Sequence, residues 1–465
     1  MLPMGMVNAL RFTSALLQSE HATGVISPTP AVPNGYSGAM SEQTRRPVLP
    51  WALWDAGAAS FNAVMTTFVF TVYLTGSDFG DETRTSLVLS AGLVCAGLVI
   101  ALTAPVIGQR ADRAGSRRSA LALNTGGIVV CSAACFLVAP EPGYLFLGVG
   151  LLSLGNVFSE IATVHYNALL PSISTPRTLG RISGLGWSMG YFGGILALLI
   201  VLLGFITPGV LGIPEDDALN IRAVALFAAL WTALLSAPLL LRFPRGPAEA
   251  PEAARRDSLA ESYRRLWRTL RRLFREEPAT LRFFLASAVF RDGLAGVFTY
   301  GGVLAAGSFG FSFQQVLVFA IAGNVVAGLG AVLGGRLDDA LGPRTVILAS
   351  LTGLLVAAAP LLVLRDPLAF WVCGLALCAF VGPAQSAART YLVRIAEPGS
   401  EGEYFGLYST TGRAVSFLAP AMFALTVWIF GAQIWGVLGI MAVLLAGLLL
   451  TLRLPRLGAD RADRA

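Results

Sequence analysis

The chain has 465 residues, of which 55% are hydrophobic and 13% are charged, with a net charge of +6 and a mean hydropathy of +0.69. A soluble domain usually carries about 25% charged residues, so folding in water would leave far too much apolar surface exposed. The sequence has no lysine, and because a phosphate-binding P-loop needs one, the composition excludes an ATP-hydrolysing pump subunit of that type. Apolar segments recur along the whole chain, which predicts a membrane protein with many spans.

The first residues, 1–49, are predicted to form a disordered tail. They are rich in Ser, Thr and Pro and lack the sustained apolar core of a signal peptide. Met40 is a plausible alternative start, because a short polar segment with two arginines follows it directly before the first apolar segment. We therefore hypothesise that the residues before Met40 are either a tail or a wrongly assigned start.

Twelve apolar segments follow, each long enough to cross a hydrocarbon core of about 30 Å as a helix. They are predicted at 51–75, 85–108, 119–139, 144–170, 187–206, 221–241, 281–306, 313–334, 344–364, 368–390, 405–429 and 432–452. Tryptophans near the predicted span ends fit an aromatic belt at the membrane surfaces. These tryptophans are Trp51, Trp54, Trp187, Trp428 and Trp435.

Arginines concentrate in alternate loops. With the N-terminus inside the cell, the cytoplasmic loops carry clusters at 110–118 and 242–275, whereas the opposite loops hold only Arg84, Arg222 and Arg365. The positive-inside rule then places both termini in the cytoplasm, which agrees with an even number of spans. Because the chain is rich in Arg, Ala and Gly and lacks lysine, we infer a GC-rich gene and expect the inner membrane of a bacterial cell.

A long charged segment, 242–280, is predicted as a cytoplasmic linker between a first bundle of residues 50–241 and a second bundle of residues 281–452, with a tail at 453–465. The linker is amphipathic over 259–273, because apolar residues recur there at steps of three and four and arginines fill much of the rest. Such a helix would either lie on an anionic leaflet or form a solvated connection between the bundles, and both readings stay open.

An internal repeat relates the two bundles. The loops after the second and the eighth predicted spans both follow the pattern Gly-x3-Asp-x2-Gly-x-Arg, at Gly108 to Arg117 and at Gly335 to Arg344, an offset of 227 residues. A second pair of matches is offset by 222 residues and comprises Pro176 and Gly184 in one half and Pro398 and Gly406 in the other. Two pairs at nearly one offset predict two homologous halves of six spans each.

The loop from Gly108 to Arg118 resembles the signature loop of the major facilitator superfamily. The resemblance implies an all-α membrane protein with twelve transmembrane helices in two pseudo-symmetric six-helix bundles. It also implies that the loop residues latch the halves together on the cytoplasmic side, although an ordinary charged turn is the simpler alternative. We expect Asp112 to accept hydrogen bonds from a helix N-terminus and to pair with a loop arginine. The gate residues implied in this way are Gly108, Asp112, Arg113, Gly115, Arg117, Arg118, Gly335, Asp339, Gly342 and Arg344.

Further segments resemble the autophagy-related vacuolar amino-acid effluxer family and its bacterial relatives, over about residues 50–455. They are Trp51 to Asp55 followed by Phe61, Tyr166 to Pro171, Gly180 to Gly184, Gly190 to Gly194, Arg291 to Gly293, Glu403 to Tyr408 and Ser416 to Pro420. The family pattern has Asn where Ala58 stands, so a polar contact is either lost or supplied by Asn62. The resemblance implies a transporter, and the fungal members of this family are linked to amino-acid efflux.

Charged residues inside spans are functional candidates by default, because an unpaired charge in a bilayer is costly. The predicted spans contain Asp55, Glu160, Arg291, Asp292, Arg389 and Arg413. Most of them fall in spans 1, 4, 7 and 10, which line the central cavity in the resembled fold. Helical spacing gives polar faces that should meet a water-filled cavity or a partner helix. These faces are Asn156 with Glu160, Thr163 and Asn167; Asp55 with Asn62; Gln385 with Arg389; and Ser409 with Arg413 and Ser416.

The residues predicted to form a substrate or proton pathway are Asp55, Asn62, Asn156, Glu160, Arg291, Asp292, Gln385 and Arg413. Arg291 or Arg413 would bind a substrate carboxylate through a two-pronged contact. Asp55, Glu160 or Asp292 would bind an amino group or carry a coupled proton, while His165 either assists or is structural. Static ion pairs that join helices are the alternative for all these charges.

These features together predict a secondary active transporter of small solutes, with amino acids or related metabolites first, that works by alternating access with or without proton coupling. A carrier of drug-like or lipid-like amphiphiles and a non-transporting receptor or scaffold are the alternatives; the buried charges argue against the first and the paired loops against the second. No nucleophile–base pair, metal cluster or cofactor motif stands out in the sequence, so we expect no enzyme, no metal and no cofactor. The expected partners are a small-molecule substrate, protons and the lipid bilayer, without nucleic acid, for a chain that is a monomer.

Overall fold

The computed structural model describes residues 47–206, 210–242 and 258–457, and the regular secondary structure in these ranges is helical throughout. The predictions for the tail before Met40, for residues 243–257 of the linker and for the end of the chain after residue 457 lie outside the described residues.

The first half of the chain folds into eight helices. They are α1 (Val48–Ser60), α2 (Phe70–Leu74), α3 (Glu82–Arg113), α4 (Arg117–Ala134), α5 (Leu145–Ala168), α6 (Leu170–Ile173), α7 (Leu179–Val201) and α8 (Leu219–Arg242). Two π-helical segments lengthen the spans, Phe61–Phe68 between α1 and α2 and Leu202–Ile206 after α7, and short 3-10 turns stand at Ser77–Phe79, Cys135–Leu137, Pro142–Tyr144 and Asp216–Ala218.

A helix that is not a span lies in the linker before the second bundle. This helix is α10 (Leu259–Arg275), and it is followed by α11 (Pro278–Phe309), α12 (Phe313–Leu341), α13 (Pro343–Ala358), α14 (Pro367–Ile395), α15 (Glu401–Val415), α16 (Leu418–Phe430) and α17 (Gly436–Leu452). Short 3-10 turns stand at Ala359–Leu362 and Gln433–Trp435.

Eleven helical segments among the described residues are long and apolar enough to cross a membrane. The remaining predicted span, the seventh (281–306), lies within α11, whose 32 residues have ample length but include Arg282, Arg291 and Asp292 and several glycines. The outer faces of the long helices carry exposed apolar side chains, such as Leu102 at 64% and Leu123 at 73% exposure, which only a lipid environment would cover. The chain is therefore an integral membrane protein built of two six-helix bundles.

The predicted start of the fifth span, residue 187, is wrong by two helical turns, because α7 already begins at Leu179. The missed residues contain Gly180, Arg181 and Gly184, which have the composition of a loop. In the structure the two glycines pack directly against α12, and this packing outweighs the low helix propensity of glycine.

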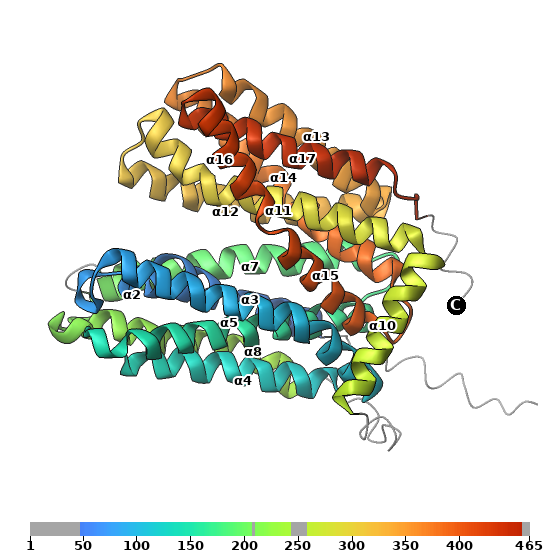
Figure 1. Ribbon diagram of the computed structural model, residues 1–465, viewed down its shortest axis with the longest axis horizontal. Helices are drawn as coiled ribbons and strands as arrows, with labels where there is room; N and C mark the ends of the chain where they lie inside the picture. Colours follow the sequence, from blue (N-terminus) through green and yellow to red (C-terminus); the bar gives the residue numbers. More distant parts are fainter. Residues whose placement is uncertain (1–46, 207–209, 243–257, 458–465) are drawn as a thin grey trace, which may run out of the picture. The chain divides into compact units, whose positions relative to one another are not determined.

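Each half has its own apolar core, and α3 and α5 connect the two. The first core surrounds Trp51 and Phe61 of the first span, and the second surrounds Phe283 and Phe290 of α11. Four residues of α3 and α5 pack into the second core: Ile100, Ala104, Val164 and Ala168. Figure 1 shows α15 lying beside α3, and α7 beside the second half, where it packs against α12.

The predicted aromatic belt is correct only in part. Trp428 is 81% exposed near the end of α16, as a residue at the membrane surface should be. Trp51 and Trp54 are instead fully buried, and their indole N–H groups donate to the Tyr166 carbonyl and to the Thr125 hydroxyl, both at 3.0 Å. Trp187 lies within α7 rather than at its end, so these three tryptophans belong to the interior of the protein.

The eleventh predicted span, 405–429, is not one continuous helix. It breaks between α15 and α16, where Pro420 lacks the N–H that a continuous helix would need. The carboxylate of Asp292 in α11 accepts a hydrogen bond of 2.5 Å from the Ala419 backbone N–H, and it thereby satisfies a free donor at the start of α16. In this conformation Asp292 is buried and stabilises the break.

We predict that Asp292→Ala lowers protein stability by about 1–3 kcal/mol, because it leaves a buried N–H without an acceptor. Asp292→Asn keeps an acceptor and should recover most of this loss. Asp366 is a matched control, since its carboxylate caps the start of α14 at an exposed position. The measurement is the thermal unfolding midpoint in detergent, and equal losses for Asp292→Ala and Asp366→Ala would contradict the role of burial.

Candidate functional site

The two halves meet closely near the end of the protein at which α10 lies. Here α3 packs against α15, and α7 packs against α12. At several glycines the backbones of the two halves touch directly. A methyl group added at any of these glycines would collide with main-chain atoms of the other half. The pairs are Gly108 with Gly402, Gly180 with Gly335, Gly184 with Ala331, and Gly406 with Pro105.

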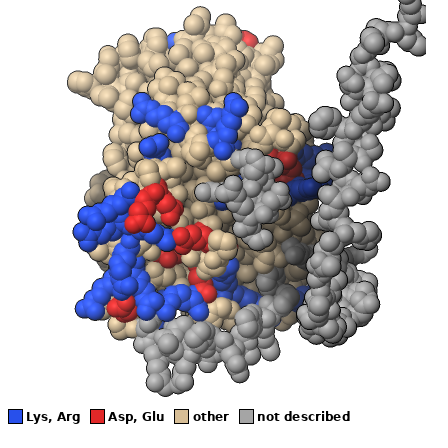
Figure 2. Space-filling model, turned by 90° about the vertical axis from the view of Figure 1, so that its right-hand side faces the viewer, with Lys and Arg blue, Asp and Glu red and all other residues tan. Residues whose placement is uncertain are grey.

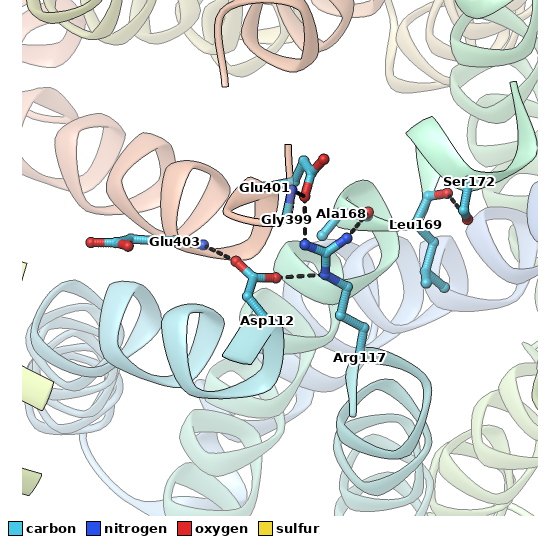
Figure 3. A network of polar contacts seen from close by, with 8 residues as sticks. All are labelled: Asp112, Arg117, Ala168, Leu169, Ser172, Gly399, Glu401 and Glu403. Atoms are coloured by element: carbon cyan, nitrogen blue, oxygen red, sulfur yellow. Dashed lines mark hydrogen bonds and ion pairs between the residues drawn. The ribbon is translucent and has the colours of Figure 1, made fainter. Parts of the chain in front are cut away.

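Asp112, at the end of α3, is the centre of a polar network between the halves (Figure 3). Its carboxylate accepts a hydrogen bond of 2.9 Å from the Glu403 backbone N–H in the first turn of α15 and pairs with Arg117 at 2.5 Å. Arg117 also pairs with Glu401 at 2.5 Å and donates to the Ala168 carbonyl at 3.2 Å. The prediction that Asp112 binds a helix N-terminus and a loop arginine is confirmed.

Asp339, the repeat partner of Asp112, makes the equivalent contact in the opposite sense. Its two carboxylate oxygens accept hydrogen bonds from the Gly180 N–H at 2.7 Å and the Arg181 N–H at 3.2 Å, in the first turn of α7. The Arg181 side chain adds an ion pair at 2.9 Å. Each half therefore presents one carboxylate to the N-terminus of a helix in the other half, where the helix dipole favours negative charge.

In the sequence repeat, Arg344 occupies the position that corresponds to Arg117. In the structure, Arg344 makes the contact that corresponds to that of Arg118. Arg118 donates to the Leu240 carbonyl near the end of α8, and Arg344 donates to the Leu452 carbonyl at the end of α17, at 2.8 Å. Both arginines therefore hold the last helix of their own half. A shift of one residue within the loop hides this correspondence from a comparison of sequences.

The remaining predicted gate residues form turns and line a cavity. Gly115 and Gly342 have φ angles of +60° and +81°, a region in which side chains are strained. Each ends a long helix and lets the chain turn directly into the next one. Arg113 lines a cavity beneath α10.

Pro105 within α3 creates a further contact between the halves. Because proline has no N–H, the carbonyl of Ala101 one turn earlier has no helical donor. Thr410 of α15 supplies the donor instead, with its hydroxyl 2.9 Å from that carbonyl.

A further ion pair with a buried arginine joins the halves in the same interface. The Arg389 guanidinium of α14 lies 3.8 Å from the carboxylate of Asp55 in α1, which also accepts a hydrogen bond of 3.3 Å from the Tyr166 hydroxyl. Arg389 is only 4% exposed, and three aromatic rings surround it at 5.1–5.6 Å. These rings belong to Trp51, Tyr166 and Trp187.

Sequence reasoning recognised Arg389 as a charge within a span but did not place it in the pathway, and it missed the aromatic surroundings. The four-residue step from Gln385 to Arg389 was the available signal. Gln385 also faces the other half, since its side-chain oxygen accepts a hydrogen bond of 2.6 Å from the Tyr191 hydroxyl.

A second ion pair joins the halves through α5 and α15. The carboxylate of Glu160 pairs with Arg413 at 2.8 Å and accepts a hydrogen bond of 3.2 Å from the Ser409 hydroxyl. These side chains are 36% and 32% exposed, more than the 23% of Asp55 and the 5% of Arg389, although both lie well inside the spans. The structure thus brings together two polar faces that helical spacing predicted separately.

The other predicted pathway residues lie apart from this pair. Arg291 stacks on the Tyr408 ring at 3.9 Å and donates to the Tyr408 carbonyl at 3.2 Å. Asn156 is half-buried one turn from Glu160, and Asn62 is exposed within the π-helical segment of the first span. His165 is fully buried, and among the described residues neither of its ring nitrogens has a hydrogen-bond partner.

Comparisons with known proteins give this chain clear relatives. A family model described as "Vacuole effluxer Atg22 like" matches residues 83–462. The MFS-type transporter YxiO of Bacillus subtilis (strain 168) is 21% identical over 412 residues, which cover 87% of this chain and 94% of that protein. Autophagy-related protein 22 of Cryptococcus neoformans var. neoformans serotype D is 24% identical over 305 residues, which cover 61% of this chain and 51% of that protein.

The fold is also found among solved structures. The proton:xylose symporter XylE of the major facilitator superfamily, bound to 6-bromo-6-deoxy-D-glucose, superposes with a TM-score of 0.71 at 14% identity, over 88% of this chain and 95% of that one. At this identity the similarity concerns the fold alone.

We predict that Gly335→Ala opens the interface at the α10 end, because the added methyl group collides with the Gly180 carbonyl. Gly301→Ala is the matched control, since a methyl group there meets open space and alanine favours a helix by about 1 kcal/mol. Spin labels at Arg177 and Leu341, in a variant without the native cysteines, would report the distance between the halves. The distance should lengthen for Gly335→Ala alone, and an unchanged distribution would contradict a tight glycine contact.

Proposed function

Because the chain belongs to the Atg22-like vacuole effluxer family and has the major facilitator fold, we propose that it is a secondary transporter of amino acids or related metabolites that works by alternating access. The known proteins it matches are transporters, and the curated fungal relative bears the name of an autophagy-related protein. The substrate class and the coupling to protons are the parts of this proposal that need direct tests.

The observation that carries the proposal is the ion pair between Glu160 and Arg413. A charge within a membrane must be paired or hydrated, and this pair has partial access to solvent. A zwitterion carries both of the charges that would replace the pair: its ammonium group would bind Glu160 while its carboxylate binds Arg413. Because one partner comes from each half, a substrate bound in this way contacts both bundles at once.

Alternating access would follow from breaking and remaking the contacts between the halves. Near the α10 end, the glycine contacts and the carboxylates of Asp112 and Asp339 hold the halves together. The Asp55–Arg389 pair and the partly exposed Glu160–Arg413 pair also join the two halves. We propose that the α10 end faces the cytoplasm of a bacterial cell, since most loop arginines lie there, and that the substrate leaves or enters at this end when these contacts separate.

Proton coupling would depend on Asp55. Its carboxylate faces Arg389 across the interface, so rocking the halves apart would remove its positive partner. A carboxylate that gains and loses an arginine neighbour changes its affinity for a proton at each step. Tyr166, whose hydroxyl contacts the same carboxylate, holds Asp55 in place from within its own half.

We predict that Glu160→Gln weakens amino-acid transport about ten- to hundredfold, because it removes a charge-assisted contact worth about 1.5–3 kcal/mol. The measurement is uptake and counterflow of amino acids in proteoliposomes, with and without an imposed pH gradient. Glu141→Gln is the control, since Glu141 is an exposed acid in a loop. If the folded wild-type protein moves no amino acid, the substrate class is wrong and amphiphile efflux becomes the leading alternative.

We predict a different result for Asp55→Asn in the same assay. Counterflow, which needs no net driving force, should persist, whereas accumulation driven by a pH gradient should fall to the level of the gradient-free control. Loss of both activities would make the Asp55–Arg389 pair a structural contact. Accumulation equal to that of the wild type would exclude Asp55 as the coupling carboxylate.

A further inference from the structure

The helix α10 is a docked part of the structure with two different faces. Figure 1 shows that it crosses the end of the helices, where it packs on α3 and α11. Ser258 caps its first turn by accepting a hydrogen bond of 3.2 Å from the Glu261 N–H. On its inner face Ser262 and Leu273 are fully buried, and Arg272 pairs with Glu397 at 2.7 Å. A freely solvated connection would not bury these side chains.

The outer face of α10 combines exposed apolar residues with arginines. Tyr263 is 43% exposed, and Trp267 and Phe274 are each 67% exposed. At 3.6 residues per turn, these three side chains lie within about 40° of one another around the helix. Arg264 and Arg271 occupy the adjacent sector and are exposed as well. This order of an aromatic stripe beside a cationic stripe is typical of helices that lie in a membrane interface.

A contact with α3 places the aromatic stripe at the lipid-facing side of the protein. The Tyr263 hydroxyl donates a hydrogen bond of 3.2 Å to the carbonyl of Leu102. Leu102 lies on the outer face of a span, is 64% exposed, and precedes the end of α3 by about 16 Å of helix. The stripe that begins at Tyr263 therefore lies where α3 meets lipid, rather than over an aqueous surface.

We propose that the outer face of α10 binds the anionic phospholipids of the leaflet at this end of the protein. The aromatic side chains would enter the boundary between headgroups and acyl chains, and the arginines would bind phosphate groups. The exposed arginines on this face match the charge of an anionic leaflet. Figure 2 shows arginine and acidic side chains gathered on this end of the structure.

The inner face of α10 connects this lipid contact to the closed interface. A cavity of about 290 Å³ lies between α10 and the contact of α3 with α15, and it is lined by Asp112 and Glu403 as well as by arginines of α10. Arg272 holds Glu397, which stands just before α15. Burial alone would lower the pKa of Arg272, but the hydrogen bond that Arg272 donates to Glu397 and the negative charge of Glu397 raise this pKa above its ordinary value, so Arg272 stays charged. Lipid bound to the outer face would therefore contact a helix that packs on α3 of the first half and on α11 of the second half.

The test places a fluorophore at Trp267→Cys in the full chain lacking its native cysteines. The protein is reconstituted in nanodiscs of phosphatidylcholine alone or of phosphatidylcholine with phosphatidylglycerol. Quenching by spin-labelled lipid should rise at least about twofold with phosphatidylglycerol, while quenching by aqueous iodide falls. Arg264→Gln/Arg271→Gln should abolish this gain, whereas Arg84→Gln/Arg365→Gln, which removes exposed arginines from the start of α3 and from the loop before α14, should keep it.

Three results would overturn the proposal. Equal quenching by iodide in both bilayers would mean that this face stays in water and is available to a soluble partner. Equal lipid quenching in both bilayers, or a gain that survives Arg264→Gln/Arg271→Gln, would mean apolar docking without preference for anionic lipid. A second label at Phe274→Cys guards against a local defect at one position. The readout requires no transport, so failure of this proposal and failure of the proposed substrate can be told apart.

Discussion

Two carboxylates, Asp112 and Asp339, each accept backbone N–H groups from the first turn of a helix in the opposite half, and the closed interface depends on this exchange. Such a contact is worth about 0.3–1 kcal/mol at an exposed helix end and up to ~2 kcal/mol where it is partly buried. Lipid provides little hydrophobic force between helices, because acyl chains are as apolar as leucine. Directional contacts of this size therefore contribute to holding the halves together.

The exchange requires helix ends to approach within hydrogen-bond distance, and the glycines make that approach possible. Gly108 meets Gly402 and Gly180 meets Gly335 at positions where a methyl group would separate the backbones. Pro105 contributes in a different way, since it leaves a carbonyl free for Thr410 of the other half. A charged turn, a small residue and a proline thus act on the same interface by different physical means.

The two ion pairs within the spans differ in their exposure. Removing one partner of a buried ion pair costs about 3–5 kcal/mol, so such charges must exchange partners rather than lose them. Arg389 is enclosed by aromatic rings and faces Asp55, whereas Glu160 and Arg413 are partly exposed. The enclosed pair suits a barrier that changes only when the halves move, and the exposed pair suits a site that a charged solute can enter.

The sequence by itself determined the membrane environment, the repeat and the two bundles, because each follows from composition or from spacing along the chain. The contacts of Asp112 were expected from the resemblance of its loop to a family signature. The sequence also placed Glu160 and Arg413 on polar faces, since helical periodicity is local. Only the tertiary structure decided which faces meet: that Glu160 pairs with Arg413, that Asp55 pairs with Arg389 and that Asp292 caps α16 instead of joining them. The structure also places Trp187 beside Arg389 rather than at the membrane surface, and it shows that Arg344 is the counterpart of Arg118 in the repeat. The reason is physical: partners separated by one to several hundred residues are selected by packing between helices, and a single sequence carries no local record of that packing.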